Sequence, residues 1–223
     1  MKALHYLFIS AASLLFFAGQ GAGAQETHGI PPEIYYLMPS FSDGMIVFDG
    51  MGPARGQLNI CAVDNTLRFL DKDGNELSAS DESRILRVRI DTVTFLRSQG
   101  VYFRLYPVTG EIGAAIRRDV QIVKDLKQGA YGTSSQTSAI REYDMITADG
   151  VTYHLDRSKE YPFRVSESVC LYQGNRVLAL SKKTLRKLFP EHKADIDAWF
   201  QEGHSLPETL PEVLDLLRRW SSQ

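Results

Sequence analysis

Apolar and polar residues alternate in short runs over the first half of the chain, from about residue 34 to residue 124. Runs such as GMIVFDG and RGQLNICAV are rich in Val, Ile and Phe and are bounded by Gly or Asp, which is typical of short strands. In RILRVRIDTVTFL, Leu86, Val88 and Ile90 occupy one face while charged residues occupy the other. Asp73-Gly74 and Gly100 indicate turns between such strands.

Hairpin signals continue further along the chain. Asp149-Gly150 and Gly174-Asn175 each stand between two alternating runs, where a turn with positive φ is favoured. The stretch RRDVQIVKDL is predicted to be a longer strand, although residues 116–126 also fit a helix. Because strands joined by tight hairpins pair antiparallel, the sheet is expected to be mostly antiparallel.

From Ser181 the apolar spacing changes from two residues to about 3.6, which is the period of a helix. Ser181 is suited to cap a first helix, and Pro190 to begin a second. Thr209 and Glu212 form a capping box before a third. Strands followed by helices predict an α+β fold, with a β-rich domain over residues 34–180. Two to three short C-terminal α-helices over residues 181–223 are expected to pack on the sheet.

The N-terminus has the three-part layout of a secretory signal peptide over residues 1–24. Lys2 gives a positive start, an apolar stretch follows, and Ala22-Gly23-Ala24 is a cleavage signal of small residues. Residues 25–33 are expected to be a flexible lead-in. No later stretch is long and apolar enough to span a bilayer. We therefore expect an exported protein, located in the periplasm, outside the cell or at the outer membrane.

Net charge and cysteine content limit the kinds of ligand and cross-link that we expect. The formal net charge is −2, and −3 once Lys2 is removed with the leader, which argues against nucleic acid or an anionic membrane as a partner. Cys61 and Cys170 both stand in strand-like apolar runs. Export permits a disulfide between them, but we favour two separate buried thiols. Two cysteines and scattered histidines provide no cluster of metal ligands, and no cofactor is expected.

The stretch GAYGTSSQTSAI, residues 129–140, is rich in hydroxyl side chains and carries no charge. It lacks the lysine of a phosphate-binding loop and the Gly-x-Ser-x-Gly pattern of a serine nucleophile. It is therefore either a connection between strands or a contact surface, since long loops are enriched in binding roles. The candidate binding residues are Tyr131, Gly132, Thr133, Ser134, Ser135, Gln136, Thr137 and Ser138.

A second pattern would support catalysis. His154 and Asp156 lie two apart on a predicted strand, and a His–carboxylate pair can orient a general base when a nucleophile is within reach. An exposed polar strand face explains the same pattern without any chemistry. We assign no catalytic residue, and a hydrolase with a site around His154 remains an alternative.

Several stretches resemble a family of secreted Bacteroidota proteins of uncharacterised function. The resemblance covers about residues 35–200 and is carried by YYLMPSFSDGMIVFDG, RGQLNICAVDNTLRFLDKDGNEL, the loop YGTSSQTSA and the ending LSKKTLRKLF with DIDAWF. It implies export and a single fold, and it brings no catalytic residues. The loop carries one Ser more than the family pattern. The resemblance makes residues 132–139 the first place to look for a contact.

Taken together, these features favour a non-enzymatic, exported binding module whose partner is an envelope protein or a glycan. A structural subunit of a surface assembly is the main alternative, and it predicts a stable interface at the helices or at an exposed sheet edge.

Overall fold

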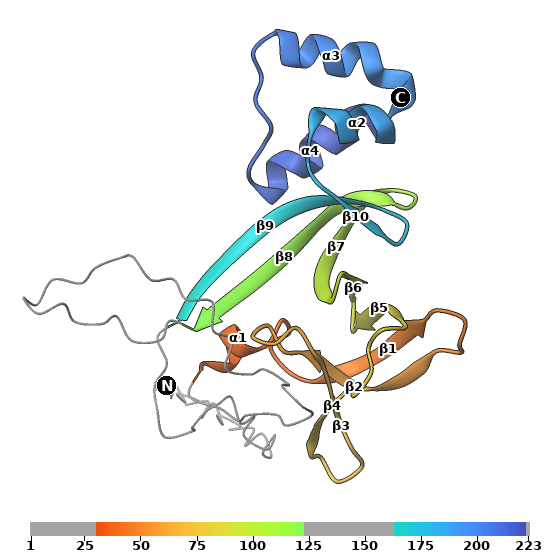
Figure 1. Cartoon of the computed structure of the whole chain (residues 1–223), viewed down its shortest axis with the longest axis vertical. Coiled ribbons are helices and arrows are strands. Elements are labelled where there is room, and N and C mark those ends of the chain that lie inside the picture. The colour runs from red at the N-terminus through yellow and green to blue at the C-terminus, as the bar shows by residue number, and fades with distance from the viewer. Residues whose placement is uncertain (1–29, 123–162, 222–223) are drawn as a thin grey trace, which may run out of the picture.

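The computed structural model describes residues 30–122 and 163–221 (Figure 1). These residues form a ten-stranded antiparallel sheet in the order β10-β9-β8-β7-β6-β5-β1-β2-β3-β4, with helices after it. The α+β prediction is thus confirmed. The strands are β1 (Ser42–Phe48), β2 (Ala54–Ile60), β3 (Leu67–Leu70), β4 (Glu76–Ser78), β5 (Ile85–Ile90), β6 (Val93–Ser98), β7 (Val101–Thr109), β8 (Ile112–Ile122), β9 (Phe163–Gln173) and β10 (Arg176–Leu178).

The sheet consists of two series of neighbouring strands, β1 to β4 and β5 to β10, joined where β1 pairs with β5. Three of the predicted turns are present. Gly74 lies between β3 and β4, Gly100 between β6 and β7, and Gly174 between β9 and β10. All three have positive φ, which glycine adopts without steric cost. Residues 116–122 belong to strand β8, so the alternative of a helix there is wrong.

The sequence pattern does not predict the turn between β5 and β6. The alternating run of residues 84–96 is not one strand but the two strands β5 and β6, which fold back at Asp91-Thr92. Asp91 has a φ of 51°, a conformation that Asp and Asn adopt more readily than most residues. The apolar alternation continues on both sides of the turn, so the hydrophobic pattern alone did not reveal it.

The sheet is strongly curved, as a set of contacts made by Arg87 shows. Arg87 lies on β5, four strands away from β9 in the sheet. Its guanidinium nevertheless donates to Asn175 Oδ1 at 2.9 Å and to the Gly174 carbonyl at 3.0 Å. It also contacts Glu111 at 2.6 Å, in the turn between β7 and β8. Curvature thus brings β5 beside the turns at the far end of the sheet.

Two positions in the fold are tightly constrained by their surroundings, Gly113 in β8 and Glu82 in the connection before β5. At Gly113 of β8, an added Cβ would lie 2.2 Å from the Tyr106 carbonyl oxygen and 2.7 Å from a ring carbon of Tyr172. In the connection before β5, the carboxylate of Glu82 is buried. It accepts hydrogen bonds from Leu67 N–H at 2.6 Å and Tyr102 OH at 2.9 Å, and it pairs with Arg97 at 3.1 Å.

The C-terminal helices pack on one end of the sheet (Figure 1). They are α2 (Lys182–Leu188), a short 3₁₀ turn η1 (Pro190–His192), α3 (Lys193–Gln201) and α4 (Leu210–Ser221). A shared core joins residues such as Leu185, Ile196 and Leu217 to Ala114 and Leu171 of the sheet. The expected caps are present. The Ser181 side chain accepts from Thr184 N–H at 3.1 Å, and Thr209 N–H donates to Glu212 at 3.2 Å.

The end of the predicted flexible lead-in belongs to the fold, which corrects that expectation for residues 30–33. Ile30 is buried, and α1 (Pro32–Tyr35) follows it with Pro32 at its first position. Ile30 and Tyr35 pack in a cluster with Cys61 of the sheet and with Val120 of β8. The lead-in was predicted from its polar, Pro-containing composition, but proline also favours the first turn of a helix.

Candidate interaction site

The predicted binding residues, Tyr131 to Ser138, lie outside the residues that the structure describes. The same holds for His154, for Asp156 and for the turn at Asp149-Gly150. The contact surface in this loop and the hydrolase alternative therefore stay predictions. The structure does fix where the segment that contains them begins and ends, because Ile122 of β8 pairs with Phe163 of β9.

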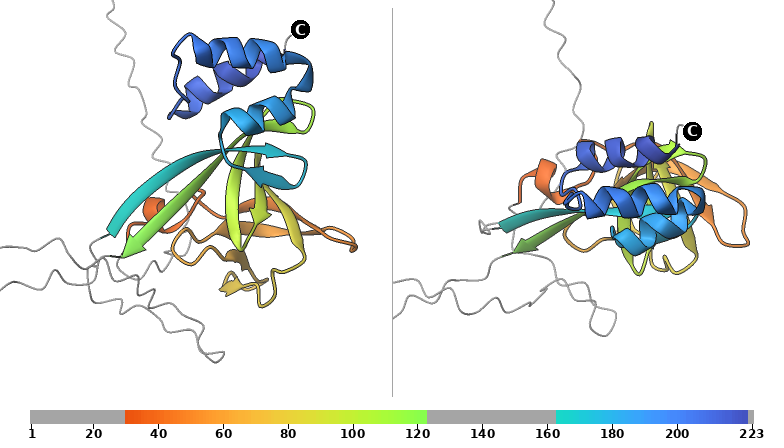
Figure 2. Two further views of the ribbon diagram at one scale, coloured as in Figure 1. Left: turned by 45° about the horizontal axis from the view of Figure 1, so that its top comes forward. Right: turned by 90° about the horizontal axis from the view of Figure 1, so that it is seen from above.

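The most distinctive surface among the described residues is the outer edge of β9. On its inner side β9 pairs with β8 along its whole length. On its outer side it pairs only with the short strand β10, through Leu171, Tyr172 and Gln173. Residues 163–170 therefore have no strand beside them within the described part of the chain. Figures 1 and 2 show this half of β9 extending away from the helices.

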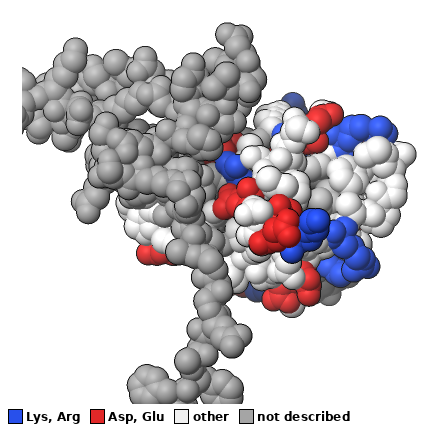
Figure 3. Space-filling model, turned by 90° about the horizontal axis from the view of Figure 1, so that it is seen from below, with Lys and Arg blue, Asp and Glu red and all other residues white. Residues whose placement is uncertain are grey.

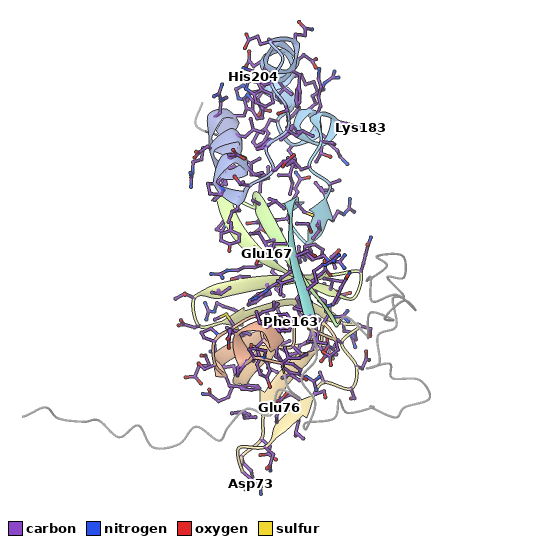
Figure 4. All side chains as sticks on the ribbon, turned by 90° about the vertical axis from the view of Figure 1, so that its left-hand side faces the viewer. Asp73, Glu76, Phe163, Glu167, Lys183 and His204 are labelled. Atoms are coloured by element: carbon purple, nitrogen blue, oxygen red, sulfur yellow. The ribbon has the colours of Figure 1, made fainter. Side chains whose placement is uncertain are left out.

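Both backbone and side chains are accessible along this border. The first six residues of β9 are exposed, and two of them are apolar, Phe163 at 37% and Val165 at 36%. They share a strand face with Glu167, while Arg164 lies on the other face. Figure 4 looks onto this side of the molecule and labels Phe163 and Glu167 along the strand. Among the described residues, the edge thus combines backbone groups that no other strand pairs with and an exposed apolar pair.

The opposite edge of the sheet is different. Strand β4 comprises only Glu76, Leu77 and Ser78, and its outer residue Leu77 is 44% exposed. The side chains of Glu76 and Ser78 accept hydrogen bonds from residues of neighbouring segments. Tyr36 OH donates to Glu76 at 2.6 Å, and Arg68 Nη1 donates to Ser78 Oγ at 2.6 Å. Short edge strands are one of the ways in which proteins discourage pairing with other chains.

A buried polar cluster lies beneath β4 and is structural. Arg68 lies at its centre, in contact with Asp64 and 3.7 Å from Glu76, and it is only 8% exposed. Burial raises the pKa of the neighbouring Cys61 thiol to about 12. Because the thiolate is the reactive form, Cys61 is not a nucleophile at neutral pH. Within residues 30–122 and 163–221, no group of three or more His, Cys, Asp or Glu is placed to hold a metal ion.

Both cysteines are free, as the sequence favoured, although only Cys61 is fully buried and Cys170 is partly exposed. We expect iodoacetamide at pH 8 to label Cys170 of the native protein first. Burial raises the pKa of both thiols, but Cys61 is enclosed and is expected to react only after unfolding. Mass spectrometry of timed samples, with a Cys170→Ser variant as the control, measures this. Equal labelling rates of Cys61 and Cys170 in the native protein would contradict the enclosed position of Cys61.

The arginines of the sheet do not form a basic surface. Arg87, Arg97 and Arg117 are paired with Glu111, Glu82 and Asp119 respectively. Cross-strand pairing also places Arg87 on one sheet face and Arg104, opposite Phe95, on the other. Figure 3 shows acidic and basic side chains next to each other on the lower face of the molecule. Binding of an acidic polymer across the sheet has no support in this arrangement.

The chain matches no known family model, no curated protein and no solved structure. The resemblance to secreted Bacteroidota proteins therefore stays a prediction. Among the described residues, no helix has the length and apolar character to cross a membrane.

Proposed function

We propose that this protein is an exported, non-enzymatic interaction module that binds an extended segment of a partner protein along the open edge of β9. The observation that carries the proposal is the difference between the two sides of β9. The strand has 11 residues and is fully paired on one side, but its outer side is paired at only three positions within residues 30–122 and 163–221.

An open strand edge favours one kind of partner. At the edge of a sheet, every second residue directs both its backbone N–H and its C=O outward, where a further strand can pair with them, and strand addition is a recurrent way of recognising extended peptides. The main-chain bonds supply affinity, while alternate side chains supply specificity. On the face of Phe163 and Val165, the incoming strand is expected to place apolar side chains opposite them. Opposite Arg164, on the other face, an acidic side chain fits best.

A second copy of this chain fits the edge less well. In a two-fold symmetric antiparallel pair, residues that stand opposite each other lie on the same face of the joined sheet. Arg164 and Glu167 are three positions apart and therefore lie on opposite faces of β9. Self-pairing cannot place these two charges opposite each other. The edge is thus better suited to a different polypeptide than to a second copy of this chain.

The test is photo-crosslinking in the native cells, with the crosslinking amino acid at Ser166 on the β9 edge. We expect a specific adduct with another polypeptide, identified by mass spectrometry. Replacing Phe163 and Val165 by lysine should reduce this adduct at least tenfold, because exposed charges discourage strand pairing. The same spectra report the mature N-terminus, which cleavage after Ala24 places at Gln25.

The control is Leu77→Lys, which introduces a lysine at an exposed apolar position on the opposite edge. It should leave the Ser166 adduct intact. Thermal unfolding of each variant checks that the fold is retained. An adduct with a second copy of the chain would favour the structural subunit instead, and a glycan adduct would overturn strand addition. The absence of any adduct at Ser166 would refute the β9 edge as the site.

A further inference from the structure

A shallow depression on the helical end of the molecule is lined almost entirely by positive charge. Its lining residues are Lys182, Lys183, Arg186, Lys187, Pro190 and Lys193. They come from α2, from η1 and from the start of α3, so three consecutive segments converge on it. The depression shares no residue with the β9 edge. Figure 4 shows Lys183 projecting outward from this end.

The positive charge of this depression is only partly compensated. Asp197 accepts from Lys182 Nζ at 2.7 Å and lies 3.7 Å from Arg186 Nε. Lys183, Lys187 and Lys193 are exposed, and no acidic side chain within the described ranges pairs with them. The chain as a whole is slightly acidic, but charges more than about 8 Å away are largely screened at physiological ionic strength. An approaching ligand therefore meets a local excess of positive charge.

The fold holds this basic face in a fixed orientation. Leu185 and Leu188, on the other side of α2, are buried in the core shared with the sheet. Lys182 is further fixed, since its ammonium lies 5.2 Å from the centre of the Phe200 ring. The backbone of α2 thus presents its cations outward on the side opposite to the buried leucines.

From this arrangement we propose a second binding site, at which the basic depression attaches the protein to the anionic headgroups of a lipid bilayer. Clusters of lysine and arginine on a helix that lies at a surface bind anionic lipid, and each such cation contributes independently near the membrane. The depression is open and shallow rather than enclosed, which suits an extended surface of phosphates better than one small anion. This site is independent of the β9 edge.

The test is cosedimentation of the purified full chain with vesicles. Vesicles of phosphatidylcholine mixed with phosphatidylglycerol should bind the protein, whereas vesicles of phosphatidylcholine alone should not. Binding should weaken as salt is added. The triple variant K183Q/K187Q/K193Q should bind roughly a hundredfold more weakly, as expected for the loss of three cations close to the surface. These three side chains are exposed, so the variant is expected to fold normally.

A control triple, R55Q/K72Q/R176Q, removes three exposed cations that lie outside the depression. It should bind anionic vesicles like the unchanged protein. Equal loss in both triples would overturn the proposal, because it would show binding through overall charge. Absence of sedimentation with either vesicle would also overturn it. If inorganic phosphate or a duplex oligonucleotide bound through these lysines but vesicles did not, the site would be one for soluble anions.

Discussion

Replacing Gly113 by alanine is expected to lower the free energy of unfolding by about 3 kcal/mol or more, which is at the upper end for added atoms in a packed interior. The new methyl group would lie 2.2 Å from the Tyr106 carbonyl oxygen and 2.9 Å from Pro107 Cα. Both are backbone atoms of β7, so they cannot turn away as a flexible side chain would. The clash can be relieved only if strands β7 and β8 move apart.

Gly56→Ala is the matched control for this substitution, since Gly56 also lies within a strand. Its nearest obstacle would be a Leu58 methyl group at 3.7 Å, an ordinary contact. Alanine there should leave stability unchanged or raise it by up to about 1 kcal/mol, because it restricts the unfolded chain. Urea unfolding of both variants measures the difference. Equal stability of the two variants would show that β7 and β8 are not packed as closely as described.

Replacing Glu82 by alanine is expected to destabilise the protein by about 3 kcal/mol, which is typical of removing one partner from a buried ion pair. The loss leaves the Leu67 N–H and the Tyr102 hydroxyl without their acceptor inside the protein, and leaves Arg97 without its counter-ion. Glu82→Gln retains an acceptor oxygen but no charge, so its effect should be intermediate. For a chain of this size, each kcal/mol lowers the melting temperature by about 2–4 °C.

Glu111→Ala is the control for the Glu82 substitution. Glu111 also pairs with an arginine, Arg87, at 2.6 Å, but its side chain is 65% exposed. Exposed pairs of this kind contribute about 0–1 kcal/mol. Thermal unfolding should therefore separate the two variants by several degrees. If both substitutions had the same small effect, the buried hydrogen bonds from Glu82 to β3 and β7 would not contribute to stability as described.

Much of the fold follows from local sequence signals. Asp73-Gly74 and Gly174-Asn175 form turns because glycine there has positive φ, and Ser181 begins a helix because its hydroxyl accepts a backbone N–H. The turn at Asp91-Thr92 was missed because apolar alternation continues through it. The ordered start at Ile30 was missed because its burial depends on contacts with β8, distant in sequence.

The two surfaces proposed to bind partners do not follow from the sequence, for a different reason. Whether Phe163 and Val165 lie on an open edge depends on which strand comes next, and hairpin signals fix neighbours but not the ends of a sheet. Among the described residues only the short strand β10 pairs with the outer side of β9, and no local pattern predicts the length of β10. The lysines between 182 and 193 looked like the polar side of ordinary helices. Only the packing of α2 against η1 and α3 gathers them around one depression.

The pairing of Ile122 with Phe163 also bears on how the length of the connection between β8 and β9 affects the sheet. The two ends of residues 123–162 are fixed about 5 Å apart by the β8–β9 ladder, whatever number of residues joins them. In general, the entropy lost in closing a loop rises only with the logarithm of its length, by about 0.6 kcal/mol per doubling. The pairing of Ile122 with Phe163 is therefore expected to depend little on how many residues join them.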